Sequence, residues 1–147
     1  MNAAALSPGD RMLVKAAEEA MNRAYAPYSR FHVGAALLDA EGGVHHGCNI
    51  ENAAYGATNC AERTALFRAI ADGKKAGSFQ AIAIIGNTEA PITPCGVCRQ
   101  VMVELCDPDM PVIMSNLQGD FEVSTVSQLL PGAFTPISLT KGEQPHS

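Results

Sequence analysis

Five cysteines are the residues of this 147-residue sequence whose spacing first indicates chemistry. Cys95 and Cys98 form a pair with two residues between them, a spacing typical of metal ligands and of redox-active dithiols. The number of cysteines is odd and we expect no signal peptide, so a disulfide framework is not predicted. Metal binding, a thioredoxin-like dithiol and a chance spacing remain as three interpretations of the pair, and metal binding is favoured.

Cys60, Cys95 and Cys98 all fall at predicted helix starts. One helix is expected to open at about Cys60, with Asn59 as its cap, and another to run over about 96–105. The free N–H groups and the dipole of a helix N-terminus favour thiolate over thiol. If the two helices are neighbours, three thiolates converge, and Zn²⁺ prefers such ligands in a tetrahedral arrangement. Three protein ligands leave the fourth position open, as in a catalytic zinc site.

Glu62 follows Cys60 by two residues, in the first turn of the same predicted helix. That position puts a carboxylate beside the metal without making it a ligand. Such a group can take a proton from zinc-bound water and return it to a substrate. An acidic residue in a first helical turn is also favoured by the helix dipole alone. The three candidate ligands beside Glu62 favour the catalytic interpretation.

These residues must be positioned by the elements around them, which predict an α/β fold. Strands are expected at about 33–38, 44–49, 79–85, 111–114 and 121–123. Helices are expected from Ser7 to Pro27 and at about 60–71, 96–105 and 126–130. Helices between strands imply parallel pairing, so we predict three α-β-α layers around a mixed five-stranded sheet. The chain is expected to be a single catalytic domain, 1–147, with its core at about 7–135 and a polar C-terminal tail.

Composition excludes several classes of function. The net charge of −5 argues against binding of nucleic acid through its phosphates. No apolar run reaches the roughly 18 residues that a membrane span requires, so no membrane partner is expected. A reducing, cytoplasmic location agrees with the cysteine content.

Two cysteine-containing segments, residues 60–65 (CAERTA) and 94–100 (PCGVCRQ), resemble the zinc-dependent cytidine deaminases. The resemblance extends to residues 28–36 and 47–55 and covers about 10–135 in all. It implies a cytidine deaminase-like fold, one Zn²⁺ per chain, and hydrolysis of cytidine and 2′-deoxycytidine to uridine and 2′-deoxyuridine with release of ammonia, in pyrimidine salvage. In that chemistry zinc-bound hydroxide attacks C4, and Glu62 shuttles the proton.

The resemblance also implies substrate contacts. Asn49 and Glu51 would hold the ribose hydroxyls, chiefly the 3′-OH, although a polar strand end is the simpler explanation of such residues. Phe31 would pack against the nucleoside unless it belongs to the core. The backbone N–H of Ala61 would bind the base. Arg63 would donate to a thiolate and offset the excess negative charge of three thiolates around Zn²⁺.

Tyr55 and Phe134 match family positions that reach the active site of a neighbouring subunit, which implies a homotetramer with shared sites. Three alternatives remain: a deaminase of a cytosine-nucleoside antibiotic, a nucleic-acid-editing deaminase, and a structural zinc module closed by a fourth cysteine. Cys48 is the residue that would close such a site, but Cys48 and Cys106 are both expected to be buried small apolar residues. His45 and His46 are not expected to be ligands, and the sequence leaves the role of His32 open.

Overall fold

The computed structural model describes residues 6–139 of the chain. Its five-stranded sheet has the order β2-β1-β3-β4-β5. The strands are β1 (Val33–Leu38), β2 (Val44–Cys48), β3 (Ala81–Gly86), β4 (Pro111–Asn116) and β5 (Phe121–Thr125). Only β3 and β4 pair in parallel, and the other three pairings are antiparallel. The predicted mixed sheet is therefore confirmed.

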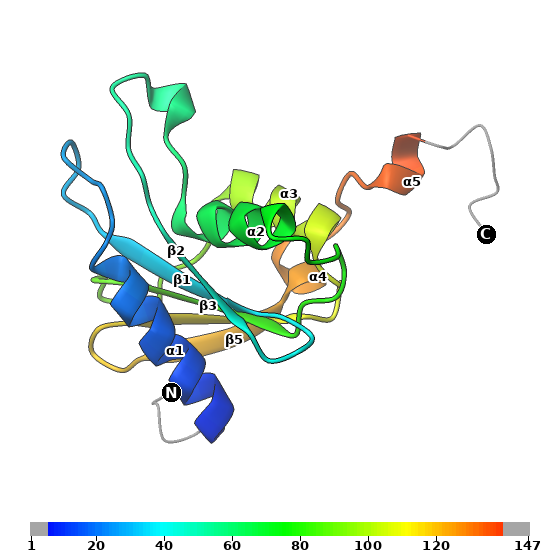
Figure 1. Cartoon of the computed structure of the whole chain (residues 1–147), viewed down its shortest axis with the longest axis horizontal. Coiled ribbons are helices and arrows are strands. Elements are labelled where there is room, and N and C mark those ends of the chain that lie inside the picture. The colour runs from blue at the N-terminus through cyan, green and yellow to red at the C-terminus, as the bar shows by residue number, and fades with distance from the viewer. Residues whose placement is uncertain (1–5, 140–147) are drawn as a thin grey trace.

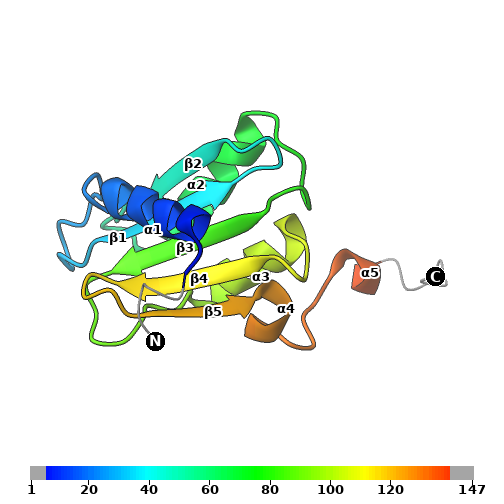
Figure 2. The same ribbon diagram turned by 90° about the horizontal axis from the view of Figure 1, so that it is seen from below.

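Helices cover both faces of this sheet, as predicted (Figures 1 and 2). Helix α1 (Pro8–Met21) lies on one face, and α2 (Ala61–Ala71) and α3 (Gly96–Leu105) lie on the other. Three short helices complete the fold: η2 (Tyr55–Ala57), α4 (Val126–Leu129) and α5 (Pro136–Leu139). Within residues 6–139, no helix is both long and apolar enough to cross a membrane.

Alternation along the strands divides the core between the two faces. On β1, Leu37 packs into the cluster under α2 and α3, whereas Ala36 packs into the cluster under α1. Strand β3 alternates in the same way and is buried along its whole length. Successive side chains of a strand point to opposite faces, so one apolar run can serve both cores.

Three sequence-based expectations about these elements were wrong. Helix α1 ends at Met21 rather than at Pro27, because Tyr25 leaves the helix to exchange backbone hydrogen bonds with Asn49 and Glu51. Cys60, and not Asn59, is the N-cap of α2, since Asn59 pairs with Ile50 in an isolated β-bridge. The β2-α2-β3 unit does not give adjacent parallel strands, because β1 lies between β2 and β3.

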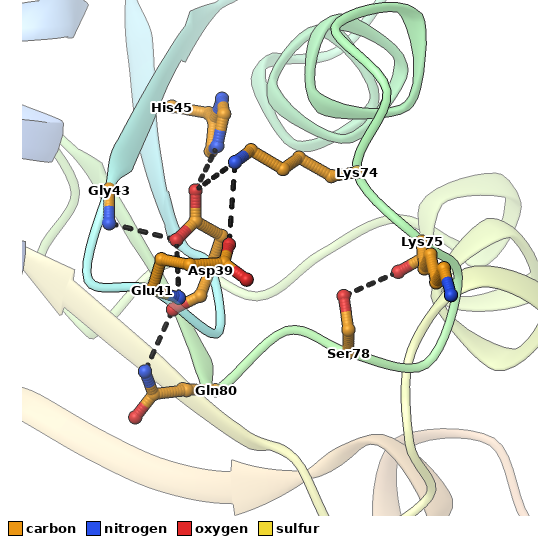
Figure 3. A network of polar contacts seen from close by, with 8 residues as sticks. All are labelled: Asp39, Glu41, Gly43, His45, Lys74, Lys75, Ser78 and Gln80. Atoms are coloured by element: carbon orange, nitrogen blue, oxygen red, sulfur yellow. Dashed lines mark hydrogen bonds and ion pairs between the residues drawn. The ribbon is translucent and has the colours of Figure 1, made fainter.

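A buried carboxylate fixes the turn between β1 and β2 (Figure 3). Asp39 Oδ1 accepts the N–H groups of Glu41 and Gly43, at 2.9 and 2.8 Å. Its Oδ2 lies 2.8 Å from Nε2 of His45 and 3.4 Å from Nζ of Lys74, beyond the end of α2. The contact with His45 is the main reason that the pKa of Asp39 lies well below its ordinary value. The hairpin is thus attached to the segment that follows α2.

Candidate active site

The three predicted metal ligands meet in space. The Sγ atoms of Cys60, Cys95 and Cys98 all lie within 4.8 Å of one another, and those of Cys60 and Cys95 are 3.7 Å apart. Cys60 is the N-cap of α2, Cys95 is the N-cap of α3, and Cys98 lies in the first turn of α3. Neither N-cap side chain accepts a capping hydrogen bond from the backbone of its own helix, which leaves both sulfurs free to approach each other.

The ligand set has an open position. Within residues 6–139, no fourth cysteine, histidine or carboxylate joins the three sulfurs. Cys48 lines a separate cavity together with Arg23 and Arg68. Cys106 is buried at the far end of α3, as expected of a small apolar residue. Three sulfur donors and one free position fit the preferences of a catalytic Zn²⁺.

The surroundings of the three sulfurs favour a thiolate, the form of cysteine that binds a cation. A hydrogen bond from Cys98, helped by the Arg63 guanidinium, lowers the pKa of Cys60 to about 5. The same hydrogen bond, together with burial, raises the pKa of Cys98. The group therefore holds a thiolate at neutral pH even before a metal binds, and thiolate is the form of cysteine that ligates zinc.

Glu62 lies beside the sulfurs and outside the ligand group. Only 4% of its surface is exposed, although the residue is charged in water. Burial raises the pKa of its carboxyl to about 7, and the negative charge of Cys60 acts in the same direction. A carboxyl with a pKa near neutrality can both take up and release a proton at the pH of most cells.

Arg63 makes the contact that the sequence predicted. Its Nη2 donates to Sγ of Cys60 at 3.3 Å. Its Nε is buried and has no hydrogen-bond partner within the described part of the chain. An unpartnered buried N–H is costly, so the side chain is held here by the attraction between the guanidinium and the sulfur group.

The segment that carries Asn49 and Glu51 runs beside the cysteine that opens α2. Ile50, between them, exchanges two backbone hydrogen bonds with Asn59, the residue before Cys60. The backbone between the two polar residues is thus paired with the segment that leads into the candidate metal centre.

Both side chains are also bound to the protein, which the sequence did not predict. Asn49 Oδ1 accepts from the N–H of Val33, and its Nδ2 donates to the carbonyl of Phe31, both at 2.8 Å. Glu51 Oε1 accepts from the N–H groups of Tyr28 and Ser29, at 2.9 and 3.1 Å, and its Oε2 accepts from the Ser29 hydroxyl. Ser29 is the residue at this site that sequence reasoning missed, because a single exposed serine in a loop carries no periodic signal.

The other residues predicted to contact the substrate are spread over several elements of the fold. Phe31 is 40% exposed and is therefore not a core residue. Ala61 is the first residue of α2, where the backbone N–H has no partner within the helix. Tyr55 is 89% exposed, in η2 at the tip of the long loop between β2 and α2 (Figure 1). Phe134 is also exposed, and its carbonyl accepts from Nε2 of Gln100 at 2.8 Å.

Comparison with known proteins gives one consistent family. Residues 8–114 match the family model described as the cytidine and deoxycytidylate deaminase zinc-binding region. Cytidine deaminase of Sporosarcina psychrophila is 54% identical over 128 residues, covering 87% of this chain and 93% of that protein. Cytidine deaminase of Halalkalibacterium halodurans is 58% identical over 125 residues, covering 85% and 93%.

Solved structures agree with the sequence relatives. A crystal structure of cytidine deaminase from Burkholderia pseudomallei superimposes with a TM-score of 0.84 at 54% identity, covering 88% of this chain and 100% of that chain. A crystal structure of cytidine deaminase from Mycobacterium tuberculosis gives a TM-score of 0.71 at 36% identity, covering 84% and 95%.

Proposed function

The chain belongs to the zinc-dependent cytidine deaminase family, and from that premise we propose that it hydrolyses cytidine and 2′-deoxycytidine to uridine and 2′-deoxyuridine. The reaction adds water to the base and releases the 4-amino group as ammonia. The observation that carries the proposal is the group of three sulfurs with the buried carboxyl of Glu62 beside it.

Cys60, Cys95 and Cys98 would hold the Zn²⁺. When bound, the ion supplies Lewis acidity, which lowers the pKa of water enough to provide a nucleophile at neutral pH. Cys95 is exposed, so substrate can approach the sulfurs from that side, while Cys98 is buried and anchors the group to α3. Arg63 offsets the negative charge that three thiolates bring.

Glu62 carries the proton through the reaction. Its carboxylate takes one proton from the attacking water and gives it to N3 of the base, which neutralises the charge that develops on the ring. The carboxylate then takes the remaining proton from the new hydroxyl on C4 and gives it to the 4-amino group, which leaves as ammonia as the C4–N bond breaks and the C4 carbonyl forms. A pKa of about 7 suits both directions of transfer.

The nucleoside is bound by the residues on the loop side of the site. Phe31 offers an exposed ring for packing, and Asn49 and Glu51 receive the sugar hydroxyls. The unpaired N–H of Ala61, at the start of α2, donates to the base. Binding of the sugar by these residues favours a nucleoside over free cytosine.

We further propose that the chain assembles as a homotetramer with shared sites and acts in pyrimidine salvage in the cytoplasm. The strong exposure of Tyr55 and Phe134 supports this assembly, because large aromatic side chains at 89% and 58% exposure gain stability when a second copy covers them. The free state of all five cysteines agrees with a reducing compartment.

The competing function is a structural zinc module with a closed four-cysteine site. The position of Cys48 in a separate cavity opposes it. Ultraviolet absorbance of cytidine tests the two functions directly. We expect the purified protein to convert cytidine to uridine, to lose this activity on treatment with a chelator, and to regain it with added Zn²⁺. A zinc-loaded protein that never changes the absorbance of cytidine would establish the structural module instead.

A further inference from the structure

The loop after α1 and the segment after β2 are bound together by backbone and side chains. Tyr25 exchanges two backbone hydrogen bonds with Asn49 and Glu51, and the Asn49 side chain bridges Phe31 and Val33. The proposed sugar-binding residues therefore sit on one interlocked unit rather than on two independent loops.

Ser29 occupies the centre of this unit. Its hydroxyl donates to Oε2 of Glu51, its N–H donates to Oε1 of the same carboxylate, and its oxygen accepts the N–H of Phe31 at 3.0 Å. Arg30, between them, has a φ of 61°, in the left-handed region that non-glycine residues rarely adopt. That local strain is tolerated because the turn brings Phe31 back to the serine oxygen.

The hydrogen bonds leave Glu51 with little free capacity. A carboxylate has about four acceptor positions on its two oxygens. Oε1 accepts from two N–H groups and Oε2 accepts from the Ser29 hydroxyl, so one position remains, on Oε2. These donors also hold the pKa of Glu51 below its ordinary value, chiefly through Ser29, so the free position stays an acceptor.

We propose that Ser29 is a positioning residue that aims the one free acceptor position of Glu51 at a single sugar hydroxyl of the nucleoside. The proposal rests on the proposed function and on the expectation that this hydroxyl is the 3′-OH. Ser29 itself contacts no reacting atom. It fixes the rotamer of Glu51 and occupies one of the two acceptor positions of Oε2, so that only the other position remains for the sugar hydroxyl.

The test compares cytidine with 3′-deoxycytidine, which lacks the hydroxyl in question. For Ser29→Ala we expect kcat/KM for cytidine to fall about tenfold, mainly through KM, because a hydrogen bond to a charged group is being misdirected. For 3′-deoxycytidine, kcat/KM should change little. The preference for cytidine, which is its kcat/KM divided by that of 3′-deoxycytidine, should therefore also fall about tenfold. Ser29→Thr keeps the hydroxyl at an exposed position and should restore the preference.

Two further variants separate positioning from general damage. Ser78→Ala removes a serine hydroxyl that donates to the Lys75 carbonyl in the α2–β3 connection (Figure 3) and should leave both substrates unaffected. In a Glu51→Ala background, Ser29→Ala should have no further effect on the preference, since the two residues act as a unit.

Equal losses on both substrates, an unchanged preference, or a Ser29→Thr protein that behaves like Ser29→Ala would each overturn the positioning role. These results are distinct from a failure of the proposed function, which would appear as absence of cytidine turnover by the zinc-loaded wild-type protein and would overturn this proposal with it.

Discussion

Nη2 of Arg63 donates to Sγ of Cys60 at 3.3 Å, from a position one turn further along α2. The pairing answers a problem of charge. Three thiolates around one Zn²⁺ carry a net charge of −1, which opposes formation of a nucleophile from water at the metal. With Zn²⁺ bound, the guanidinium beside this sulfur would draw electron density from the thiolate and would bring the net charge of the group to zero.

Substitution of Arg63 should therefore reduce turnover more than folding. For Arg63→Gln we expect kcat to fall by about ten- to a hundredfold, the range seen when partners of metal ligands are removed. Steady-state kinetics with cytidine and zinc content per chain are the measurements. Arg68→Gln, on the same helix, is the matched control, because Arg68 bonds to the carbonyl of His46 instead of to a sulfur. Wild-type turnover in Arg63→Gln would remove Arg63 from the chemistry.

Glu62→Gln should separate the proton transfer from metal binding. The amide keeps the shape of the side chain but cannot shuttle a proton, so we expect kcat to fall by about 10²- to 10⁴-fold. Zinc content should stay at one ion per chain. The thermal midpoint should be no lower than that of the wild type, because a neutral amide avoids the cost of burying a carboxylate whose pKa is raised. A variant that retains most of its turnover contradicts the role proposed for Glu62.

The zinc content of single cysteine variants should distinguish metal ligands from the other cysteines. Cys60→Ala, Cys95→Ala and Cys98→Ala should each bind zinc far more weakly, because two sulfurs cannot replace three. Cys48→Ala and Cys106→Ala should retain about one zinc per chain, since neither sulfur belongs to the group. Elemental analysis after dialysis against a weak chelator measures the difference. Zinc loss in Cys48→Ala but not in Cys95→Ala would show that the ligand set is wrong.

The order and type of the main helices and strands could be predicted from the sequence, because each is indicated by a local pattern of residues. The apolar run ending at Ile85 and the glycine-rich turn at 42–43 each predict one structure. The sequence did not predict which residues of each helix are buried. Val97 on α3 is apolar and yet 57% exposed, because Cys98 and Met102 form the buried side of that helix. The apolar side chain of a single residue does not show which side of a helix faces the sheet.

At the site, the metal group was predictable because its three sulfurs share a type, a spacing and a position at helix starts. The hydrogen bonds of Glu51 were not, because Ser29 lies 22 residues away in the chain. Such a contact depends on how the loop after α1 folds back, and no local pattern encodes that path. The burial of Glu62 could not be predicted either, because it depends on how α2 packs against the rest of the fold.

The Asp39 network should make stability fall in acid. The folded pKa of Asp39 lies below the value of about 3.9 for an unfolded aspartate, so its ionised form stabilises the fold above that pH. The contribution is lost as the pH falls through the folded pKa. Asp39→Asn should therefore lower the thermal midpoint near neutral pH, and its difference from wild type should shrink below about pH 4.

Thermal unfolding followed by circular dichroism across this range is the measurement. Glu41→Gln is the control, because Glu41 pairs with Lys74 at the surface, where ion pairs contribute little. A constant difference between Asp39→Asn and wild type at every pH would show that the ionisation of Asp39 does not stabilise the fold.

Gly47, on β2, sets the position of the helix that bears Cys60 and Glu62. A Cβ at Gly47 would lie 2.3 Å from the carbonyl oxygen of Ala61 and 2.5 Å from the backbone nitrogen of Ala65. Both are backbone atoms of α2, so the helix itself would have to move. We expect Gly47→Ala to destabilise the fold by at least about 1–3 kcal/mol, the usual cost of overpacking, and to weaken zinc binding and turnover.

Two other glycines distinguish loss of stability from displacement of the site. Gly34→Ala would clash with α1, where its Cβ would lie 1.9 Å from the Ala17 carbonyl oxygen, so it should destabilise the fold with less effect on zinc. Gly9→Ala meets nothing within 4 Å and should stabilise α1 by about 0.5–1 kcal/mol. Chemical denaturation and zinc affinity, measured on all three, are decisive. Because α2 carries one proposed ligand, Cys60, and the proposed proton shuttle, Glu62, only the Gly47 variant should lose zinc affinity out of proportion to its loss of stability.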